Sequence, residues 1–174
     1  VRTVAVTGPP DSGKTAAVAE LAESLLQKGV PVSGFIQVGE FENEMKVGFR
    51  LREIESGDEA PLARLAGRND GDFGTRFVFS EEGFALGRAA LGRTAPGGVV
   101  IVDELGPVEI RGDGHMPSVL KAMQVPDLAA AVVVVRRSLV PSFLAILEAT
   151  DAVVLDIDDL GDSAPETILH ALAL

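Results

Sequence analysis

The chain has 174 residues, of which 47% are hydrophobic, and a formal net charge of −11 at pH 7. This length fits one domain with a full core, so we expect residues 1–174 to form a single globular α/β domain. The negative charge argues against nucleic acid or an anionic membrane as a main partner, because both require clustered Lys and Arg.

The absence of cysteine excludes disulfides and thiolate chemistry. No uninterrupted apolar run approaches the roughly 20 residues that span a bilayer, and no basic-then-apolar leader is visible. These features predict a cytoplasmic protein. Because the chain starts at Val1 and not at Met, its start could be native or the edge of an excised domain.

Apolar periodicity predicts strands and helices in alternation. In chain order, we expect a strand over 4–6, a helix over 14–28, a strand over 32–38, an antiparallel ribbon over 41–55, mostly loop over 55–74, a strand over 76–79, a helix over 81–93, a strand over 99–102, a loop through 106–107, a helix over 117–123, a strand over 130–135, a helix over 140–148, a strand over 152–157 and a helix over 165–174. This order indicates an α/β fold, with a mostly parallel sheet covered by helices on both faces and an appended antiparallel β-ribbon.

The middle third of the chain differs from the rest. Residues 45–54 alternate between apolar and polar, which is typical of a ribbon at the sheet margin. Residues 55–74 are rich in Gly, Asp, Glu and Arg, and we expect them to be the most mobile segment. Seven of the eight phenylalanines lie between Phe35 and Phe84, which favours a small satellite core over a base-stacking surface.

The first functional motif is G-x-x-x-x-G-K-T, placed between the first strand and the first helix. Glycines leave the backbone N–H groups of such a loop free to surround a phosphate, and the helix N-terminus adds its positive dipole end. Lys14 brings a charge to the outer phosphates, and the hydroxyl of Thr15 is a ligand for Mg²⁺. The predicted nucleotide-binding residues are Gly8, Pro9, Pro10, Asp11, Ser12, Gly13, Lys14, Thr15 and Ala16. Asp11 is unusual, because its carboxylate lies close to the phosphates and is expected to weaken binding.

The second motif is a pair of acids, Asp103 and Glu104, which follow the all-apolar strand over 99–102. Open α/β sheets bind ligands at this carboxyl edge of their strands. Asp103 is therefore predicted to hold Mg²⁺, directly or through water. Glu104 is predicted to orient or deprotonate the water that attacks the terminal phosphate.

Tandem arginines follow the strand over 130–135. Either Arg136 or Arg137 could stabilise the charge that develops on the terminal phosphate, and Arg136 is assigned this catalytic role. A surface pair in an acidic protein is an equally good interpretation, and the sequence does not say which arginine faces the site.

The remaining candidates carry weaker signals. Glu109 and Arg111 could support the acids or form a surface ion pair. His115 and His170 are isolated, so we expect surface or hydrogen-bonded histidines and no metal site. Asp156, Asp158 and Asp159 are expected to be solvated.

Taken together, these motifs resemble a family of small P-loop nucleoside triphosphatases with a RecA-like sheet, related to the thermophile and human cancer-related enzymes. The resemblance covers most of the chain. It rests on the sequence runs at 7–15, 32–35 (Val-Ser-Gly-Phe), 46–50 (Lys-Val-Gly-Phe-Arg) and 102–110 (Val-Asp-Glu-Leu-Gly-Pro-Val-Glu-Ile). It implies slow, Mg²⁺-dependent hydrolysis of several nucleotides, with Lys14, Thr15, Asp103 and Glu104 in the roles given above. Residues 155–160, Leu-Asp-Ile-Asp-Asp-Leu, replace the family's usual Asn-Arg-Asp motif, so the sequence does not predict a base preference.

These observations predict a Mg²⁺-dependent nucleoside-triphosphatase that binds ATP, GTP or other triphosphates with low base selectivity. Two alternatives stay open at this point. One is a small-molecule or nucleotide kinase whose acceptor pocket, over 41–74, is clamped by Arg52, Arg64 or Arg76. The other is a nucleotide-sensing module without turnover that acts through an unidentified protein partner.

Overall fold

A computed structural model describes residues 1–67 and 71–174. In these residues, eight strands form one sheet in the order β5-β4-β3-β2-β6-β7-β1-β8. The strands are β1 (Arg2–Thr7), β2 (Val32–Glu42), β3 (Met45–Glu53), β4 (Glu59–Leu65), β5 (Phe77–Phe79), β6 (Val99–Leu105), β7 (Ala130–Val135) and β8 (Val153–Asp156). The helices are α1 (Lys14–Gln27), α2 (Glu81–Gly92), α3 (Pro107–Ile110), α4 (Met116–Met123), α5 (Val140–Ile146), α6 (Ile157–Leu160) and α7 (Ala164–Leu172), with short 3-10 turns at Asp72–Gly74 (η1), Arg137–Leu139 (η2) and Gly161–Ser163 (η3).

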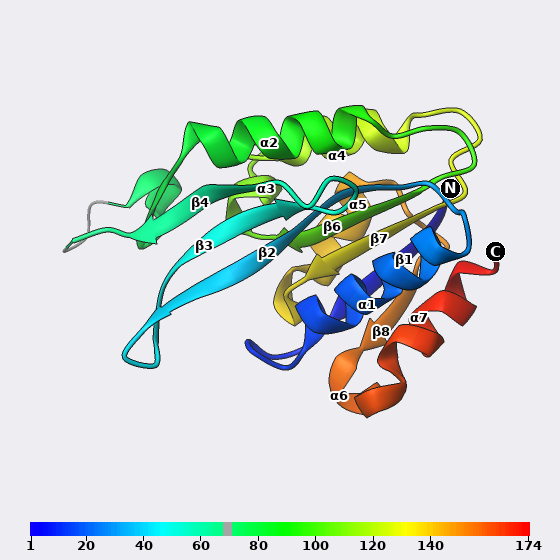
Figure 1. The fold of residues 1–174 in the computed structure, drawn as a ribbon, viewed down its shortest axis with the longest axis horizontal. Helices are drawn as coiled ribbons and strands as arrows, with labels where there is room; N and C mark the ends of the chain where they lie inside the picture. Colours follow the sequence, from blue (N-terminus) through cyan, green and yellow to red (C-terminus); the bar gives the residue numbers. More distant parts are fainter. Residues whose placement is uncertain (68–70) are drawn as a thin grey trace.

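The sheet is parallel on one side and antiparallel on the other. Strands β2, β6, β7, β1 and β8 run parallel, whereas β3, β4 and β5 extend from β2 as an antiparallel meander. The β2–β3 hairpin projects far beyond the parallel part (Figure 1). The predicted α/β fold with a mostly parallel sheet and an appended ribbon is confirmed.

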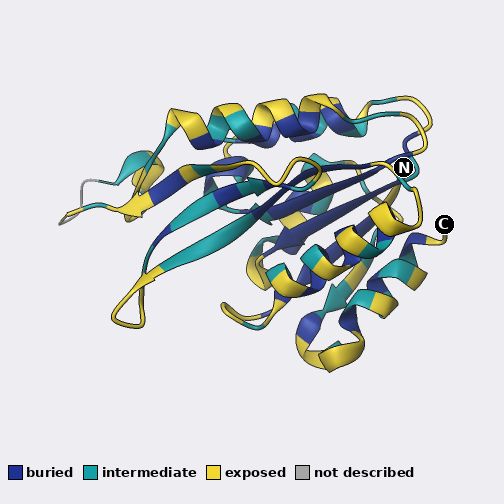
Figure 2. Cartoon of the chain, in the orientation of Figure 1, coloured by how far each residue is buried: buried dark blue, intermediate teal, exposed yellow. Residues whose placement is uncertain are grey.

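Helices cover both faces of the sheet. Helices α1 and α7 pack on one face and α2 and α4 on the other (Figure 1). Strand β7 is buried over its whole length, and β6 nearly so, because each carries apolar side chains toward both layers (Figure 2). These two central strands are therefore fixed from both sides, and their carboxyl ends are well placed to hold functional groups.

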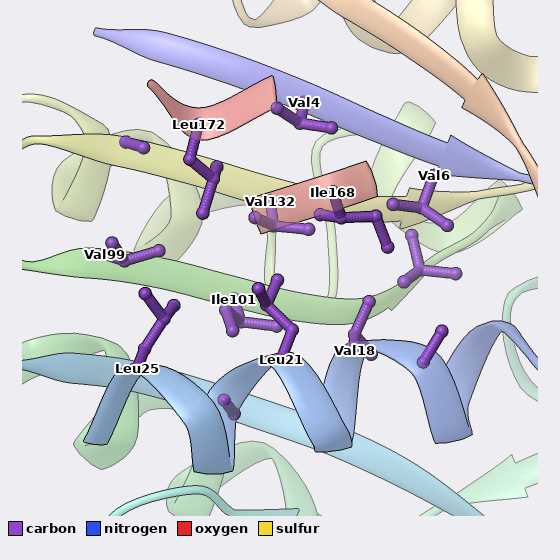
Figure 3. Packing of buried hydrophobic residues seen from close by; sticks show 14 of the residues in the cluster. Val4, Val6, Val18, Leu21, Leu25, Val99, Ile101, Val132, Ile168 and Leu172 are labelled. Atoms are coloured by element: carbon purple, nitrogen blue, oxygen red, sulfur yellow. The ribbon is translucent and has the colours of Figure 1, made fainter. Parts of the chain in front are cut away.

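Helix α1 shows how the sequence pattern produces the packing. Its buried residues recur at three- and four-residue spacing, so Val18, Leu21 and Leu25 all point toward Val99 and Ile101 of β6 (Figure 3). Burial of each such Leu or Val stabilises the fold by roughly 1.5–3 kcal/mol. The helix begins at Lys14 directly after the loop, so this packing also fixes the position of the loop.

The prediction of mostly loop over 55–74 is wrong in part, because Glu59–Leu65 forms strand β4, which pairs with both β3 and β5. Pro61 obscured the strand pattern, since proline lacks a donor for the ladder. The structure accommodates Pro61 at an irregularity in the β3–β4 register, and Leu62 and Ala63 are buried. Residues 68–70, which belong to the segment predicted to be mobile, lie outside the described residues.

Two further differences concern short elements. The segment through Gly106 and Pro107, predicted as loop, leads into α3, with Pro107 at the first helical position, where its missing N–H costs nothing. The predicted satellite core is also different, since Phe49, Phe77, Phe79 and Phe84 pack onto the main cluster beneath α2. Among the described residues, no helix combines the length and the hydropathy needed to cross a bilayer.

Candidate functional site

The predicted site residues meet in one cleft of about 1570 Å³. Strands β1, β6, β7 and β8 are parallel and end at the same edge, so the segments that follow them converge there. The lining includes all of the residues predicted to bind nucleotide or Mg²⁺ or to act in catalysis, namely Gly8, Pro9, Pro10, Asp11, Ser12, Gly13, Lys14, Thr15, Ala16, Asp103, Glu104 and Arg136.

The phosphate loop depends on two glycines for different reasons. At Gly13, φ is 92°, a left-handed conformation that glycine adopts without strain. At Gly8, a Cβ atom would lie 2.5 Å from Cγ2 of Ile157 in α6, so a larger residue does not fit. The loop is thereby held between β1 and α6, with the N-terminus of α1 opening into the cleft.

Lys14 is buried at the base of the loop, and only 7% of its surface is exposed. Its ammonium donates hydrogen bonds to the backbone carbonyls of Gly8 and Pro9. A buried ammonium requires such partners, because an unpaired charge in the interior is strongly destabilising. The loop carbonyls therefore fix the positive charge of Lys14 at the base of the loop, where the sequence predicts a phosphate site.

Asp11 has a partner that the sequence did not reveal. Lys46 of β3 lies 2.6 Å from Oδ1 of Asp11, and its ammonium also lies 5.4 Å from the ring centroids of Phe41 and Phe49. Asp11 has a φ of 57°, a left-handed conformation that Asp tolerates better than most residues. The β2–β3 hairpin thus supplies a cation that offsets the carboxylate beside the phosphate loop.

Replacing Lys46 with Met is expected to weaken triphosphate binding by about 3- to 10-fold, because it leaves Asp11 uncompensated next to the phosphates. The effect on folding should stay below about 1 kcal/mol, since the pair is partly exposed to solvent. Combining Lys46→Met with Asp11→Gly should restore most of the affinity in equilibrium titrations. Additive losses in the double variant would show that Lys46 acts without Asp11.

Asp103 is buried at the end of β6, with 1% of its surface exposed. The backbone N–H of Gln37 donates to Oδ2 at 3.4 Å, and the nearby hydroxyl of Thr15 acts to lower the pKa of the carboxyl group. Burial nevertheless raises the pKa of Asp103 to about 7, and the neighbouring Glu104 adds to this effect. A cation bound here would favour the charged carboxylate.

Asp103 and Thr15 therefore fit a Mg²⁺ site. Within the described ranges, no group of three or more His, Cys, Asp and Glu side chains forms a metal cage. This arrangement is compatible with Mg²⁺, which typically takes one or two protein ligands and completes its shell with water and substrate phosphates.

Glu104 and Arg136 face one another across the cleft. Oε1 of Glu104 accepts a hydrogen bond from Nε of Arg136 at 3.1 Å, and both side chains stay partly exposed. Gln37 donates from its side chain to the backbone carbonyl of Glu104 at 3.1 Å. Arg136 thus orients the carboxylate, Gln37 holds the backbone of the same residue, and the side chain of Glu104 stays partly exposed in the cleft.

The two arginines contact different acids. Arg137 pairs with Asp156 at 2.5 Å and with Asp158 at 3.6 Å, on the far side of the loop from Glu104. Asp156 also caps α6 by accepting from the N–H of Asp158. Asp158 and Asp159 are exposed, as expected, whereas the side chain of Asp156 is only 20% exposed and is held by these contacts, so the expectation of solvation is wrong for Asp156 alone. Of the two arginines, Arg136 is the one that contacts a predicted catalytic residue.

Glu109 and His115 are both buried, which contradicts a surface position for either. The carboxylate of Glu109 accepts from the backbone N–H groups of Gly106 and His115, at 2.9 and 3.2 Å. The imidazole of His115 lies between the rings of Phe35 and Phe84, and neither nitrogen has a hydrogen-bond partner among the described residues. Desolvation lowers the pKa of His115 to about 4, with a smaller contribution from Arg88.

This depressed pKa gives a stability prediction. Between pH 6.5 and 4 the unfolded chain binds a proton at His115 that the folded chain does not, so acidification favours unfolding. We expect His115 to destabilise the protein by about 3 kcal/mol at pH 4 relative to pH 7. Denaturant unfolding of wild type and His115→Leu across this range should show a shallower pH slope for the variant. Parallel curves would contradict a neutral buried imidazole.

Sequence reasoning missed two residues of the site, Gln37 and Lys46. Gln37 is a polar residue inside a largely apolar predicted strand, and such a residue in a buried strand often indicates a functional contact. Lys46 was noted only as part of a resemblance, because nothing in the sequence indicated that the hairpin reaches the phosphate loop.

The sequence is similar to those of known proteins. A family model described as NTPase matches residues 3–167. The nucleoside-triphosphatase THEP1 of Thermofilum pendens is 34% identical over 147 residues, which cover 84% of this chain and 81% of the relative. The nucleoside-triphosphatase THEP1 of Methanopyrus kandleri is 29% identical over 177 residues, which cover 97% of this chain and 96% of the relative.

Solved structures share the fold. A human cancer-related nucleoside triphosphatase, determined in solution, superposes with a TM-score of 0.73 at 22% identity and covers 99% of this chain and 96% of its own. The crystal structure of THEP1 from Aquifex aeolicus superposes with a TM-score of 0.72 at 21% identity, over 99% of both chains. At these identities the likeness concerns the fold alone.

Proposed function

The chain belongs to the NTPase family, and from this premise we propose that its cleft hydrolyses nucleoside triphosphates to the diphosphate and phosphate, with Mg²⁺ and with low base selectivity. The observation that carries the proposal is the convergence of the phosphate loop, Asp103 and Glu104 on one cleft. Family membership supports hydrolysis over the kinase and the sensing module.

In this proposal, the phosphate loop binds the triphosphate through its backbone N–H groups, and Lys14 holds the outer phosphates. The buried position of Lys14 supports this role, since its ammonium needs no reorientation from outside the loop. Thr15 and Asp103 would hold Mg²⁺. When bound, the ion neutralises charge on the outer phosphates.

Glu104 orients the attacking water and accepts its proton. As the water oxygen bonds to the γ-phosphorus, the bond from this phosphorus to the oxygen bridging the β- and γ-phosphates breaks. Arg136 stabilises the charge that develops on the phosphoryl oxygens, and it also fixes the carboxylate of Glu104 through the 3.1 Å hydrogen bond.

The low base selectivity is supported by the surroundings of Asp156. Attack from the Glu104 side directs the nucleoside away from Glu104, toward β8 and α6. There the carboxylate of Asp156 is engaged by Arg137 and by the N–H of Asp158, so this side chain is committed within the protein and does not read a base edge.

Phosphate release from ATP, GTP, CTP and UTP, with and without Mg²⁺, tests the proposal. We expect similar rates for the four nucleotides and negligible release without Mg²⁺. Nucleotide binding without any phosphate release would contradict hydrolysis, and a strong preference for one base would contradict low selectivity.

A further inference from the structure

The cleft is larger than one ligand requires. Its volume of about 1570 Å³ exceeds the roughly 300–1,000 Å³ typical of a small-molecule site. The phosphate loop and the acids of β6 account for one end. The other end lies over the antiparallel strands, and we name it the aromatic chamber, lined by Phe49, Phe77, Phe79, Phe84, Arg52 and Arg76.

Aromatic rings form the walls of the chamber. Phe79 and Phe84 are stacked, with ring centroids 5.5 Å apart and an interplanar angle of 13°, and Phe49 lies 5.3 Å from Phe77. All four side chains are only partly buried and line the cleft. Ring faces arranged in this way favour a planar apolar group through offset and edge-to-face contacts.

Two cations in the chamber, Arg52 and Arg76, have no acidic partner among the described residues. Among residues 1–67 and 71–174, no carboxylate lies within 4.0 Å of the guanidinium of Arg52 or Arg76, and Arg76 lies 5.2 Å from the ring centroid of Phe77. Ion pairs are formed by Arg50, Arg64, Arg88, Arg93, Arg136 and Arg137, whereas Arg2 and Arg111 donate to the backbone carbonyls of Ala171 and Phe73. In a chain of net charge −11, two arginines that line a cleft and pair with no carboxylate in the described ranges favour an anionic ligand.

His115 adds an independent observation at the base of the chamber. Its ring lines the cleft beside Phe84, at a centroid distance of 5.1 Å, and both nitrogens lack a hydrogen-bond partner in the described part of the chain. Leaving a buried donor or acceptor unpaired costs roughly 1–3 kcal/mol. The edge of the ring that carries Nδ1 lies against Gly87 of α2, so His115 closes the base of the chamber with its ring and its nitrogens do not face the ligand.

The chamber lies on the attacking side of the γ-phosphate. The sheet order places β2, β3, β4 and β5 on one side of β6, and β7, β1 and β8 on the other. An in-line reaction at Glu104 sends the nucleoside toward β8, as argued above. The position of the chamber relative to the γ-phosphate rests on the proposed function, because the role of Glu104 defines the attacking side. Binding of a ligand in the chamber does not depend on that function.

We infer that the aromatic chamber is a second ligand site, which takes a small molecule with a planar apolar ring and at least one anionic group, beside the bound triphosphate. The phenylalanines hold the ring, Arg52 and Arg76 hold the anion, and His115 lies within the base of the site. In the proposed reaction the nucleoside extends toward β8, on the opposite side of the phosphate loop, so we expect the chamber to bind a molecule other than the base of the nucleotide.

Fluorescence titration with anilinonaphthalene sulfonate, a planar anion, tests the inference, and phenylnaphthylamine serves as its uncharged counterpart. We expect one equivalent of the anion to bind and Arg52→Gln/Arg76→Gln to weaken this binding by about 10-fold or more, because charge-assisted hydrogen bonds are lost. Binding of phenylnaphthylamine should change little. The matched control is Arg50→Gln/Arg64→Gln, which removes the same charge from β3 and β4 outside the cleft lining.

Competition with Mg²⁺–ADP separates the chamber from the nucleotide site. We expect saturating Mg²⁺–ADP to leave the bound anion in place, and Arg52→Gln/Arg76→Gln to keep the rise in melting temperature that Mg²⁺–ADP gives the wild type. Competitive displacement would assign the chamber to the nucleotide base and overturn the inference. Equal losses in both double variants would overturn it as well. A protein that binds the anion but releases no phosphate would refute only the proposed hydrolysis.

Discussion

Replacing Glu104 with glutamine is expected to lower the turnover number for triphosphate hydrolysis by about 10²- to 10⁴-fold, the usual contribution of a positioned general base. Glutamine retains the carbonyl oxygen that can accept from Arg136, so the local geometry should persist. It cannot accept a proton from water at neutral pH. The nucleotide affinity should therefore stay within about 3-fold of wild type, because the phosphate loop is unchanged.

Single-turnover phosphate release and equilibrium binding of the same triphosphate separate these two effects. Glu59→Gln is the matched control, since it makes the same chemical change at a carboxylate that pairs with Arg50, outside the cleft lining. A Glu104→Gln protein that hydrolyses as fast as wild type would remove the catalytic role from Glu104. A large loss of affinity with unchanged turnover would instead make Glu104 a binding residue.

Replacing Lys14 with methionine is expected to weaken triphosphate binding by about 100-fold or more, equivalent to roughly 3 kcal/mol. The unbranched apolar side chain fills most of the same space, so the buried position stays packed. The lost contribution is the charged hydrogen bonding of the ammonium to phosphate oxygens. The variant Lys14→Ala removes the whole side chain beyond Cβ and should abolish nucleotide binding.

Folding provides the internal check on this variant. The ammonium of Lys14 is held by carbonyls of the loop in the absence of ligand, so its removal also relieves the burial of a charge, and thermal unfolding should show no large destabilisation. Lys121→Met, at the exposed end of α4, is the control for loss of a lysine. Retained affinity in a folded Lys14→Met protein would contradict the assignment of the phosphate site.

The parallel half of the fold was readable from the sequence because its strands are continuous apolar runs. Strands β6 and β7 are buried on both faces, and such runs carry a strong signal over a few residues. The antiparallel half was harder. Strand β4 contains Pro61 and exposed charges, and it is defined by pairing with β3 and β5 and not by its own composition.

The candidate site divides in the same way. The sequence predicts the phosphate loop and the acids of β6 because each is encoded in contiguous residues, where a strand, a tight turn and a helix start depend on near neighbours. The chain could not reveal that Gln37 contacts Asp103, 66 residues away, or that Lys46 reaches Asp11, 35 residues away. Each of these contacts requires a particular neighbour across the sheet or loop.

By itself, the sequence determined that this protein has a G-x-x-x-x-G-K-T loop, which predicts phosphate binding, a buried strand ending in two acids, and alternating strands and helices that form an α/β sheet. Only the tertiary structure decided that Arg136 contacts Glu104 while Arg137 pairs with Asp156, that His115 is buried without hydrogen-bond partners among the described residues, and that the phenylalanines line a chamber beside the acids. The physical reason is that hydrophobic periodicity fixes which face of an element is buried, but not which strands become neighbours. The order of the strands in the sheet sets these contacts, and it follows from packing of the whole chain.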